Sequence, residues 1–204
     1  MSKDSTRNIP RQPRSQQTVD LILDTAAILF AEMGYENATT NAIADKAGMS
    51  IGTLYRYFPD KNAILKALAD RYHEQVRLLL EDLFVEDTKH LPPESLLDRL
   101  IDPFIEVYRK QPVYAHILLG ADVSADIADA SSDLDKEMIE RMANFFYELA
   151  PHLDETRAHM MAVISKAAIK MLVSLVLASS DEKYQEDLVA EVKQMLLRYL
   201  WPIL

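Results

Sequence analysis

Residues 39–61 constrain the fold more than any other stretch, because two short helices and a tight turn follow one another there. Thr39 or Thr40 can cap the first helix by accepting a hydrogen bond from a free backbone N–H. Gly48 follows where the chain must turn with a positive φ, and Ser50 can cap the second helix. The pattern predicts a helix-turn-helix, which places one helix in the DNA major groove.

The apolar residues of this stretch have the spacing of two helices that pack on each other. Ile43 and Ala47 share one face of the first helix, and the small alanine allows a close approach. Leu54 and Phe58 have the same relation in the second helix. Pro59 ends that helix, because proline has no backbone N–H and disfavours helical geometry in the residue before it.

Two segments of this stretch resemble the DNA-binding domain of TetR-family transcriptional regulators. They are Ile-Ala-Asp-Lys-Ala-Gly-Met-Ser from residue 43 and Gly-Thr-Leu-Tyr-Arg-Tyr-Phe-Pro-Asp-Lys from residue 52. The preceding helix also resembles the family's first helix, with Phe30 on its apolar stripe and Gly34-Tyr35 at its end. The resemblance covers about residues 15–65. It implies three N-terminal helices around DNA and six C-terminal helices for ligand binding and dimerisation.

Helical periodicity over the rest of the chain also predicts an all-α protein of about nine helices. Outside the helix-turn-helix, helices are expected at about 15–33, 62–84, 93–111, 112–120, 122–149, 154–179 and 181–201. Pro103 should kink its helix or leave a carbonyl unpaired. The stretch from Ala121 to Asp135 is rich in Asp, Ser and Ala, a composition that also permits irregular structure.

The charge of the chain is unevenly distributed. The net charge is −10, yet residues 1–73 hold nine basic and eight acidic residues, so the excess acid lies further on. We expect a flexible basic arm at 1–14, a helix-turn-helix DNA-binding domain at 15–62, and a ligand-binding and dimerisation domain at 63–204. The arm could be an inert tail or could touch DNA through its arginines, and the sequence favours neither.

The amino-acid composition bears on the cellular compartment of the protein and on the metal and disulfide chemistry that it can have. Cysteine is absent, which excludes disulfides and thiolate metal ligands and is compatible with the cytoplasm. No apolar run is expected to reach the length of a membrane span, and no secretory signal or membrane role is expected. No metal site and no cofactor are predicted, because the five histidines include no HExxH motif and no close pair.

Ten residues are expected to meet DNA, by their positions against the family motif. Those that resemble phosphate-contacting residues are Thr39, Thr40, Thr53, Tyr57 and Lys61, and those that resemble groove-facing residues are Asn41, Ile51, Gly52, Tyr55 and Arg56. Asn41 could bond an adenine edge, and Arg56 a guanine edge or a phosphate. Gly52 offers close backbone approach. The groove-facing residues include too few hydrogen-bonding side chains to predict an operator sequence.

The family places a small-molecule pocket among the C-terminal helices. The candidates are Phe104, Tyr108, Tyr114, His116, Ile117, Met138, Met142, Phe145, Phe146, Met161, Ile164 and Ser165. Their character indicates an apolar or aromatic effector with a few polar anchors. Ordinary core packing is the alternative for each of them.

The last two helices are more apolar than one core-facing stripe requires, which indicates a homodimer with a palindromic operator. The interface candidates are Ala167, Ala168, Met171, Leu175, Leu196, Tyr199 and Trp201. The alternative is a purely intramolecular core. The resemblance favours repression of transcription over activation.

Two other classes of function stay open. A helical interaction module would bind a protein and not DNA. A helical enzyme would need a motif that this chain lacks, since no Gly-x-Ser-x-Gly, P-loop or dinucleotide-binding glycine motif is present.

Overall fold

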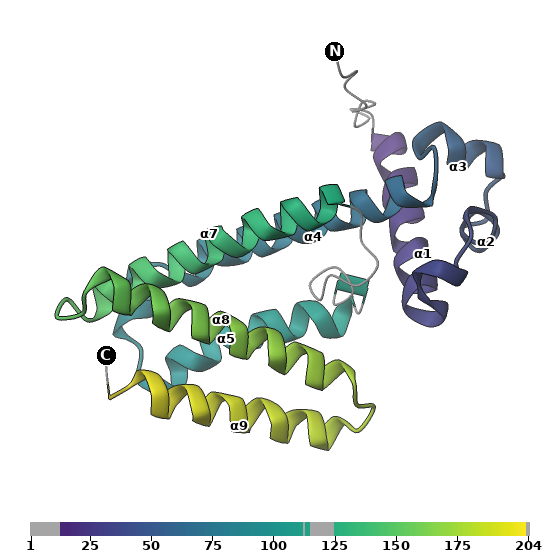
Figure 1. Cartoon of the computed structure of the whole chain (residues 1–204). Coiled ribbons are helices and arrows are strands. Elements are labelled where there is room, and N and C mark those ends of the chain that lie inside the picture. The colour runs from purple at the N-terminus through teal and green to yellow at the C-terminus, as the bar shows by residue number, and fades with distance from the viewer. Residues whose placement is uncertain (1–12, 112, 115–124, 203–204) are drawn as a thin grey trace, which may run out of the picture. The chain divides into compact units, whose positions relative to one another are not determined.

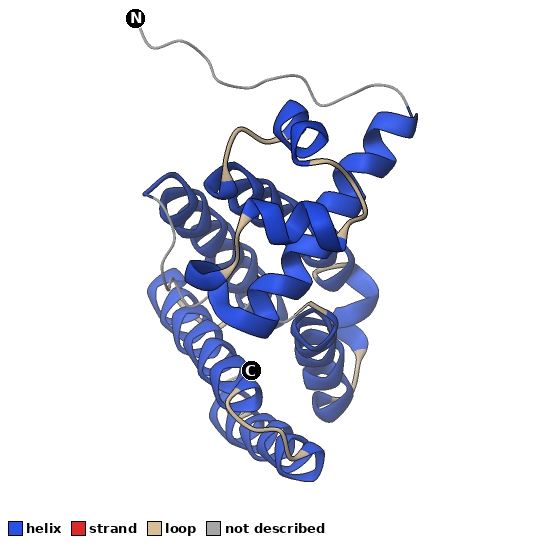
Figure 2. Ribbon diagram, turned by 90° about the vertical axis from the view of Figure 1, so that its right-hand side faces the viewer, coloured by secondary structure: helices blue, strands red, loops and turns tan. Residues whose placement is uncertain are grey.

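The computed structural model describes residues 13–111, 113–114 and 125–202, and every regular element in these ranges is helical (Figures 1 and 2). The described residues form eight α-helices and one 3-10 helix, so the predicted all-α class is confirmed. The helix expected at 112–120 falls almost entirely outside the described residues, as does most of the N-terminal arm.

The chain divides into two compact units, residues 1–68 and 69–204. Helix α4 (Lys61–Leu83) contains the boundary and is continuous through it. The first unit holds α1 (Pro13–Asn37), α2 (Thr40–Lys46) and α3 (Ile51–Tyr57) with the start of α4. The α1 backbone leaves helical geometry at Gly34, where φ is 80° and ψ is 156°.

The turns of the first unit are fixed by short-range hydrogen bonds. Thr39 Oγ1 accepts from the Ala42 N–H at 3.1 Å, and Ser50 Oγ accepts from the Thr53 N–H at 3.1 Å. Gly48 lies between the two helices with φ of 68°. These caps satisfy N–H groups that a helix leaves free at its N-terminus, so the sequence of the loop sets where α2 and α3 begin.

The core of the first unit is built by the apolar stripes of its helices. Ile22, Ile43 and Leu54 are fully buried, and they come from α1, α2 and α3 respectively. α2 packs against both α1 and α3. As the apolar spacing of residues 39–61 predicts, one face of each short helix is buried and the other face is in solvent.

The second unit contains the rest of α4 and the remaining helices. They are the 3-10 helix η1 (Glu86–His90), α5 (Pro93–Lys110), α7 (Ala125–Leu149), α8 (Glu155–Leu177) and α9 (Glu182–Leu200). The 3-10 helix η1 was not predicted from sequence patterns. The stretch up to Asp135 is helical from Ala125 onward, so its polar composition does not interrupt α7. Pro103 lies inside α5, which continues to Lys110.

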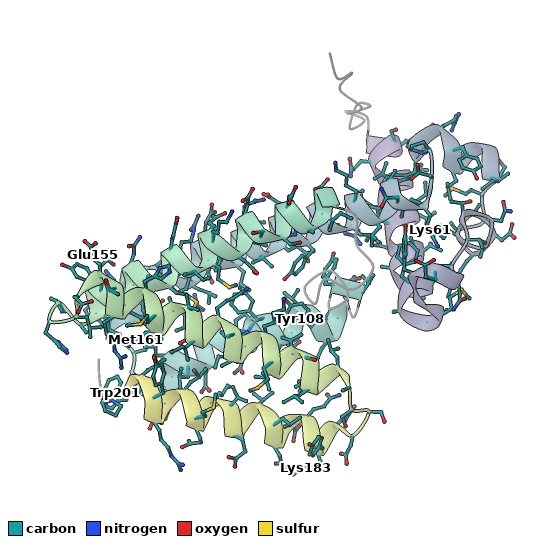
Figure 3. The ribbon with its side chains drawn as sticks, viewed as in Figure 1. Lys61, Tyr108, Glu155, Met161, Lys183 and Trp201 are labelled. Atoms are coloured by element: carbon teal, nitrogen blue, oxygen red, sulfur yellow. The ribbon has the colours of Figure 1, made fainter. Side chains whose placement is uncertain are left out.

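Helix α8 is the centre of the second unit. It packs against α7, α9 and α5, and it runs antiparallel to α9, so that Glu155 and Trp201 lie at the same end of this helix pair (Figure 3). By length and composition α8 could also cross a membrane, so the expectation that no apolar run reaches that length was wrong. One such helix is weak evidence for a membrane segment, because the core helix of a globular unit has the same composition.

Replacing Gly48 by alanine should destabilise the first unit by about 1–2 kcal/mol, because a Cβ disfavours the positive φ of this residue. Gly48→Asn should cost less, since asparagine tolerates this conformation. Urea denaturation followed by circular dichroism measures both. Equal stability of Gly48→Ala and the unmodified chain would contradict the turn geometry.

Candidate nucleic-acid interface and effector site

The outer face of α2 and α3 presents the predicted groove-facing residues. Asn41, Gly52, Tyr55 and Arg56 are exposed, and Ile51 is half-buried. Tyr55 leaves 48% of its surface in solvent. An exposed aromatic side chain beside a basic one is suited to meeting a nucleic acid.

Hydroxyl groups on this face are held in pairs before any DNA arrives. The Thr40 and Tyr55 hydroxyl oxygens lie 3.2 Å apart and join α2 to α3. The Ser50 and Thr53 hydroxyls are hydrogen-bonded at 2.9 Å. Each hydroxyl can still accept or donate a further bond, so these pairs orient groups that could meet phosphate oxygens.

Tyr57 connects the end of α3 to the start of α1. Ser15 Oγ donates to its hydroxyl at 3.5 Å, and the Arg56 guanidinium lies 5.8 Å from the centre of its ring. Hydrogen bonds from Ser15 and Thr18, with the nearby Arg56 charge, lower the pKa of Tyr57. This environment favours a hydroxyl that donates to an anion, which is what a phosphate contact requires.

Lys61, predicted to contact phosphate, makes intramolecular contacts in the structure (labelled in Figure 3). Its Nζ donates to the Tyr35 carbonyl at 2.5 Å and to the Glu36 carbonyl at 3.1 Å, and it lies 4.2 Å from the centre of the Tyr35 ring. The ammonium thereby caps the carbonyl end of α1 and ties it to the start of α4. The sequence motif identified the residue but not this intramolecular role, because its partners are 25 and 26 residues away.

Gly52 is a glycine that the chain's own packing does not require. A Cβ built on it would come no closer than 3.9 Å to another atom, which is Ser50 Oγ. Its φ is not in the left-handed region. Glycine inside a helix costs about 0.5–1 kcal/mol relative to alanine. The open space beside Gly52 is compatible with the predicted close approach of DNA to this backbone.

Most of the predicted effector residues lie in the core of the second unit. The buried ones are Phe104, Tyr108, Tyr114, Met142, Phe145, Phe146, Met161 and Ser165. Met138 is half-buried, while His116 and Ile117 lie outside the described residues. Ile164 is 47% exposed, so its assignment to an internal pocket is corrected by the structure. It lies about one turn from Met161 along α8, at the exposed edge of the buried face.

Three tyrosines from three segments meet in this core. The Tyr72 and Tyr108 hydroxyl oxygens are 2.5 Å apart, and the Tyr72 and Tyr114 ring centres are 5.0 Å apart. Burial raises the pKa of Tyr72 to about 12 and raises that of Tyr108 well above its usual value. Both phenols are therefore protonated hydrogen-bonding groups at neutral pH. Tyr72, on α4, was missed because it fits an ordinary apolar stripe.

Polar groups on other helices continue this cluster. His73 Nε2 and Ser131 Oγ lie 3.1 Å apart, and Lys166 forms an ion pair with Asp135. Burial, with the nearby Arg77, lowers the pKa of His73 against the opposing effect of Asp70 and Asp135. The imidazole is thus neutral near pH 7. The core is therefore polar as well as aromatic.

Ser165 is the one predicted anchor whose buried hydroxyl has no hydrogen-bond partner among the described residues. It is 2% exposed and lies on the face of α8 that carries Met161 and Ala168. An unsatisfied buried hydroxyl costs about 1–3 kcal/mol. Such a group is a natural partner for the polar atom of a ligand.

The outer face of α8 is a continuous apolar stripe. It consists of Met160, Val163, Ile164, Ala167, Met171 and Leu175, all exposed. Ala167, Met171 and Leu175 were predicted at the dimer interface, and so was Trp201, which is 49% exposed after the end of α9. The structure adds Met160, Val163 and Ile164, whose spacing along the helix continues the stripe towards its start.

Two interface candidates are corrected. Ala168 is 8% exposed and Leu196 is 2% exposed, so both belong to the core of the single chain. Tyr199 is half-buried, and its hydroxyl has no partner among the described residues. Adjacent residues of an apolar helix point to different sides, and composition alone did not separate Ala167 from Ala168.

Two known protein families match this chain over most of its length. Residues 22–68 match the family described as bacterial regulatory proteins, tetR family, and residues 92–200 match the tetracyclin repressor-like C-terminal domain. The chain belongs to the TetR family of transcriptional regulators. A TetR-family chain with this helix-turn-helix is a DNA-binding protein and not an enzyme.

Individual relatives of this TetR-family regulator are distant. The transcriptional repressor KstR of Mycobacterium tuberculosis is 26% identical over 156 residues, which cover 75% of this chain and 68% of KstR. The nucleoid occlusion factor SlmA of Actinobacillus pleuropneumoniae is 28% identical over 133 residues, which cover 65% of this chain and 59% of SlmA. FadR of Bacillus subtilis, solved with stearoyl-CoA, has a TM-score of 0.63 at 23% identity, covering 89% of this chain and 96% of FadR.

Gly52→Ala should raise the stability of this regulator by up to about 1 kcal/mol, because it removes a helix glycine without a clash. The same change should weaken DNA binding by roughly tenfold, about 1.4 kcal/mol, because the methyl group stands where DNA approaches. Thermal unfolding and fluorescence anisotropy on labelled DNA measure the two effects. Tighter DNA binding together with higher stability would show that the glycine does not face the groove.

Proposed function

We propose that this TetR-family protein is a ligand-responsive repressor that binds a palindromic operator as a homodimer and is released by a small apolar or aromatic effector. The observation that carries the proposal is the exposed apolar stripe of α8. Binding to an operator places its work in the bacterial cytoplasm. KstR, the relative described above, is named a repressor.

One helix-turn-helix reads only half of such an operator. A two-fold dimer reaches two major grooves about 34–36 Å apart, and the symmetry of the DNA site then mirrors that of the protein. The stripe on α8 supplies a self-complementary surface for this pairing. The small side chain of Ala167 lets the helices of two copies approach closely at this point of the stripe.

Exposed apolar residues on α9 extend the same proposal. Tyr184 and Met195 are 54% and 46% exposed. They are eleven residues apart, which is about three helical turns, so both side chains lie on the same side of α9. Since α8 and α9 pack against each other, two copies of this pair would form a four-helix bundle. Apolar patches of this kind are uncommon on monomers unless they bind something.

Met171→Glu should separate the dimer, because it puts a charge at the middle of an apolar interface. Affinity for a two-half-site operator should fall on the order of 100-fold, since the two recognition units no longer act together. Leu78→Glu is the matched control, because Leu78 is 57% exposed on α4 and outside the stripe. Sedimentation velocity measures the oligomeric state, and fluorescence anisotropy measures operator affinity. A Met171→Glu variant that stayed dimeric would contradict the proposal.

The effector part of the proposal rests on the polar aromatic core of the second unit. Buried phenols at Tyr72 and Tyr108, with the unsatisfied hydroxyl of Ser165, favour a ligand that has an apolar body and one hydrogen-bonding group. FadR, which shares the fold, was solved with an acyl-CoA. The effector can lower operator affinity only by the ratio of its own affinities for the two conformations. It must therefore bind the DNA-free conformation more tightly than the DNA-bound one.

Ser165→Ala should raise the stability of the protein by about 1 kcal/mol, because it removes an unsatisfied buried hydroxyl. It should also weaken the response to the effector and leave operator affinity in the absence of effector unchanged. The assay is release of labelled operator by stearoyl-CoA, stearate and a panel of aromatic acids. Ser174→Ala, on the same helix but half-exposed, is the control. An effector response that survives Ser165→Ala undiminished would remove Ser165 from the site.

A further inference from the structure

A half-buried cation borders the exposed apolar stripe of α8. Lys166 pairs with Asp135 and thereby marks the side of α8 that faces α7. Lys170 follows one turn later, so it lies on the same side, at the edge of the stripe. It forms no ion pair with any described residue, and Ser174, one turn further on, is not acidic.

A carboxylate lies among the exposed apolar residues of α9. Glu191 is seven residues after Tyr184 and four before Met195, so the three side chains share one side of the helix. Lys193, two residues on, is directed to the opposite side, where it pairs with Asp98 of α5 at 2.7 Å. Within the described chain Glu191 is exposed and has no ion-pair partner.

These two charges lie at nearly the same level of the α8–α9 hairpin. The helices run antiparallel and are joined by a short turn (Figure 3). Lys170 is seven residues before the end of α8 at Leu177, and Glu191 is nine residues after the start of α9 at Glu182. At 1.5 Å per residue the two levels differ by only about 3 Å.

Two-fold symmetry can bring the two charges together. The proposed dimer face has an α8 half, bordered by Lys170, and an α9 half, which contains Glu191. A two-fold axis that runs along the hairpin sets the α8 half of each copy on the α9 half of the other. Rotation about this axis does not change a residue's level, so residues of equal level meet. Each contact then occurs twice, once in each direction.

We propose that Lys170 of each copy pairs with Glu191 of the other, and that the two reciprocal pairs select a second copy of this chain as the occupant of the face. The inference rests on the proposed homodimer and adds its symmetry and register. A half-buried cation loses further hydration when the apolar face is covered, so an acidic residue must meet it there. An apolar partner without that carboxylate is disfavoured by the same cost.

Arg198 is the competing partner for Glu191, because it lies seven residues further along the same side of α9. It would meet Glu191 of a second copy if the axis crossed the helices beside Met195 and set α9 antiparallel on α9. That axis also sets α8 on α8. The one acidic residue of α8 is Glu155 in its first turn, so Lys170 would have no acidic residue level with it. The arrangement along the hairpin is therefore favoured.

The test uses charge reversals in the full chain, with sedimentation velocity as the measure of dimerisation. Lys170→Glu and Glu191→Lys each turn two attractive contacts of their own dimer into repulsive ones, so self-association should weaken on the order of tenfold. An equimolar mixture of the two variants should dimerise like the unmodified chain, because every contact between positions 170 and 191 again joins opposite charges. Circular dichroism checks that each variant is folded.

Matched controls separate this pairing from a general effect of charge. Lys110→Glu and Glu74→Lys make the same charge changes on exposed residues of α5 and α4 and should leave dimerisation unchanged. A chain with both Lys170→Glu and Glu191→Lys should dimerise with itself. It should exchange subunits with the unmodified chain on the order of tenfold less, as measured by energy transfer between chains labelled at their N-termini.

Three results would overturn the inference while the homodimer stands. The first is single variants that dimerise like the unmodified chain. The second is a mixture no more dimeric than either variant alone. The third is restoration of Glu191→Lys by Arg198→Glu and not by Lys170→Glu, which would assign the axis that crosses the helices. An unmodified chain that stays monomeric would remove the proposed homodimer itself, and this inference with it.

Discussion

Helix α8 carries apolar side chains on two sides, and a single chain can bury only one of them. The inner side, with Met161, Leu172 and Val176, holds α7, α9 and α5 together. The outer side leaves Met160, Ile164 and Met171 in water. We propose that a second copy covers this outer side, since stable interfaces usually bury about 800 Å² on each partner. Every statement about a palindromic operator depends on that pairing.

In the DNA-binding unit, short helices are held at fixed angles by few residues. Two seven-residue helices are too short to be stable alone, and their caps, the Gly48 turn and a small shared core supply what length does not. Lys61 adds a tie between the carbonyl end of α1 and α4. The hydroxyl pairs on the outer face are then fixed by the same scaffold, so that little side-chain ordering remains to be done when DNA binds.

The sequence predicted local features well because local signals determine them. Thr39, Gly48 and Ser50 act within three or four residues of themselves, and the structure places caps and turn where the pattern indicates. The side on which a helix packs is a tertiary property, so Ala168 was assigned to the surface and Ile164 to the interior, the reverse of what is observed. The contacts of Lys61 and the hydroxyl pair of Tyr72 and Tyr108 join distant segments. Spacing along one helix could not reveal them.

The most direct test of pairing on DNA is selection of duplexes from a random DNA pool by the protein at low ionic strength. If two copies bind together, inverted repeats are enriched whose half-sites are centred about 10–10.5 base pairs apart, or a multiple of that spacing. Enrichment of a single unrepeated half-site, or no enrichment by a protein whose N-terminal unit is folded, would contradict it.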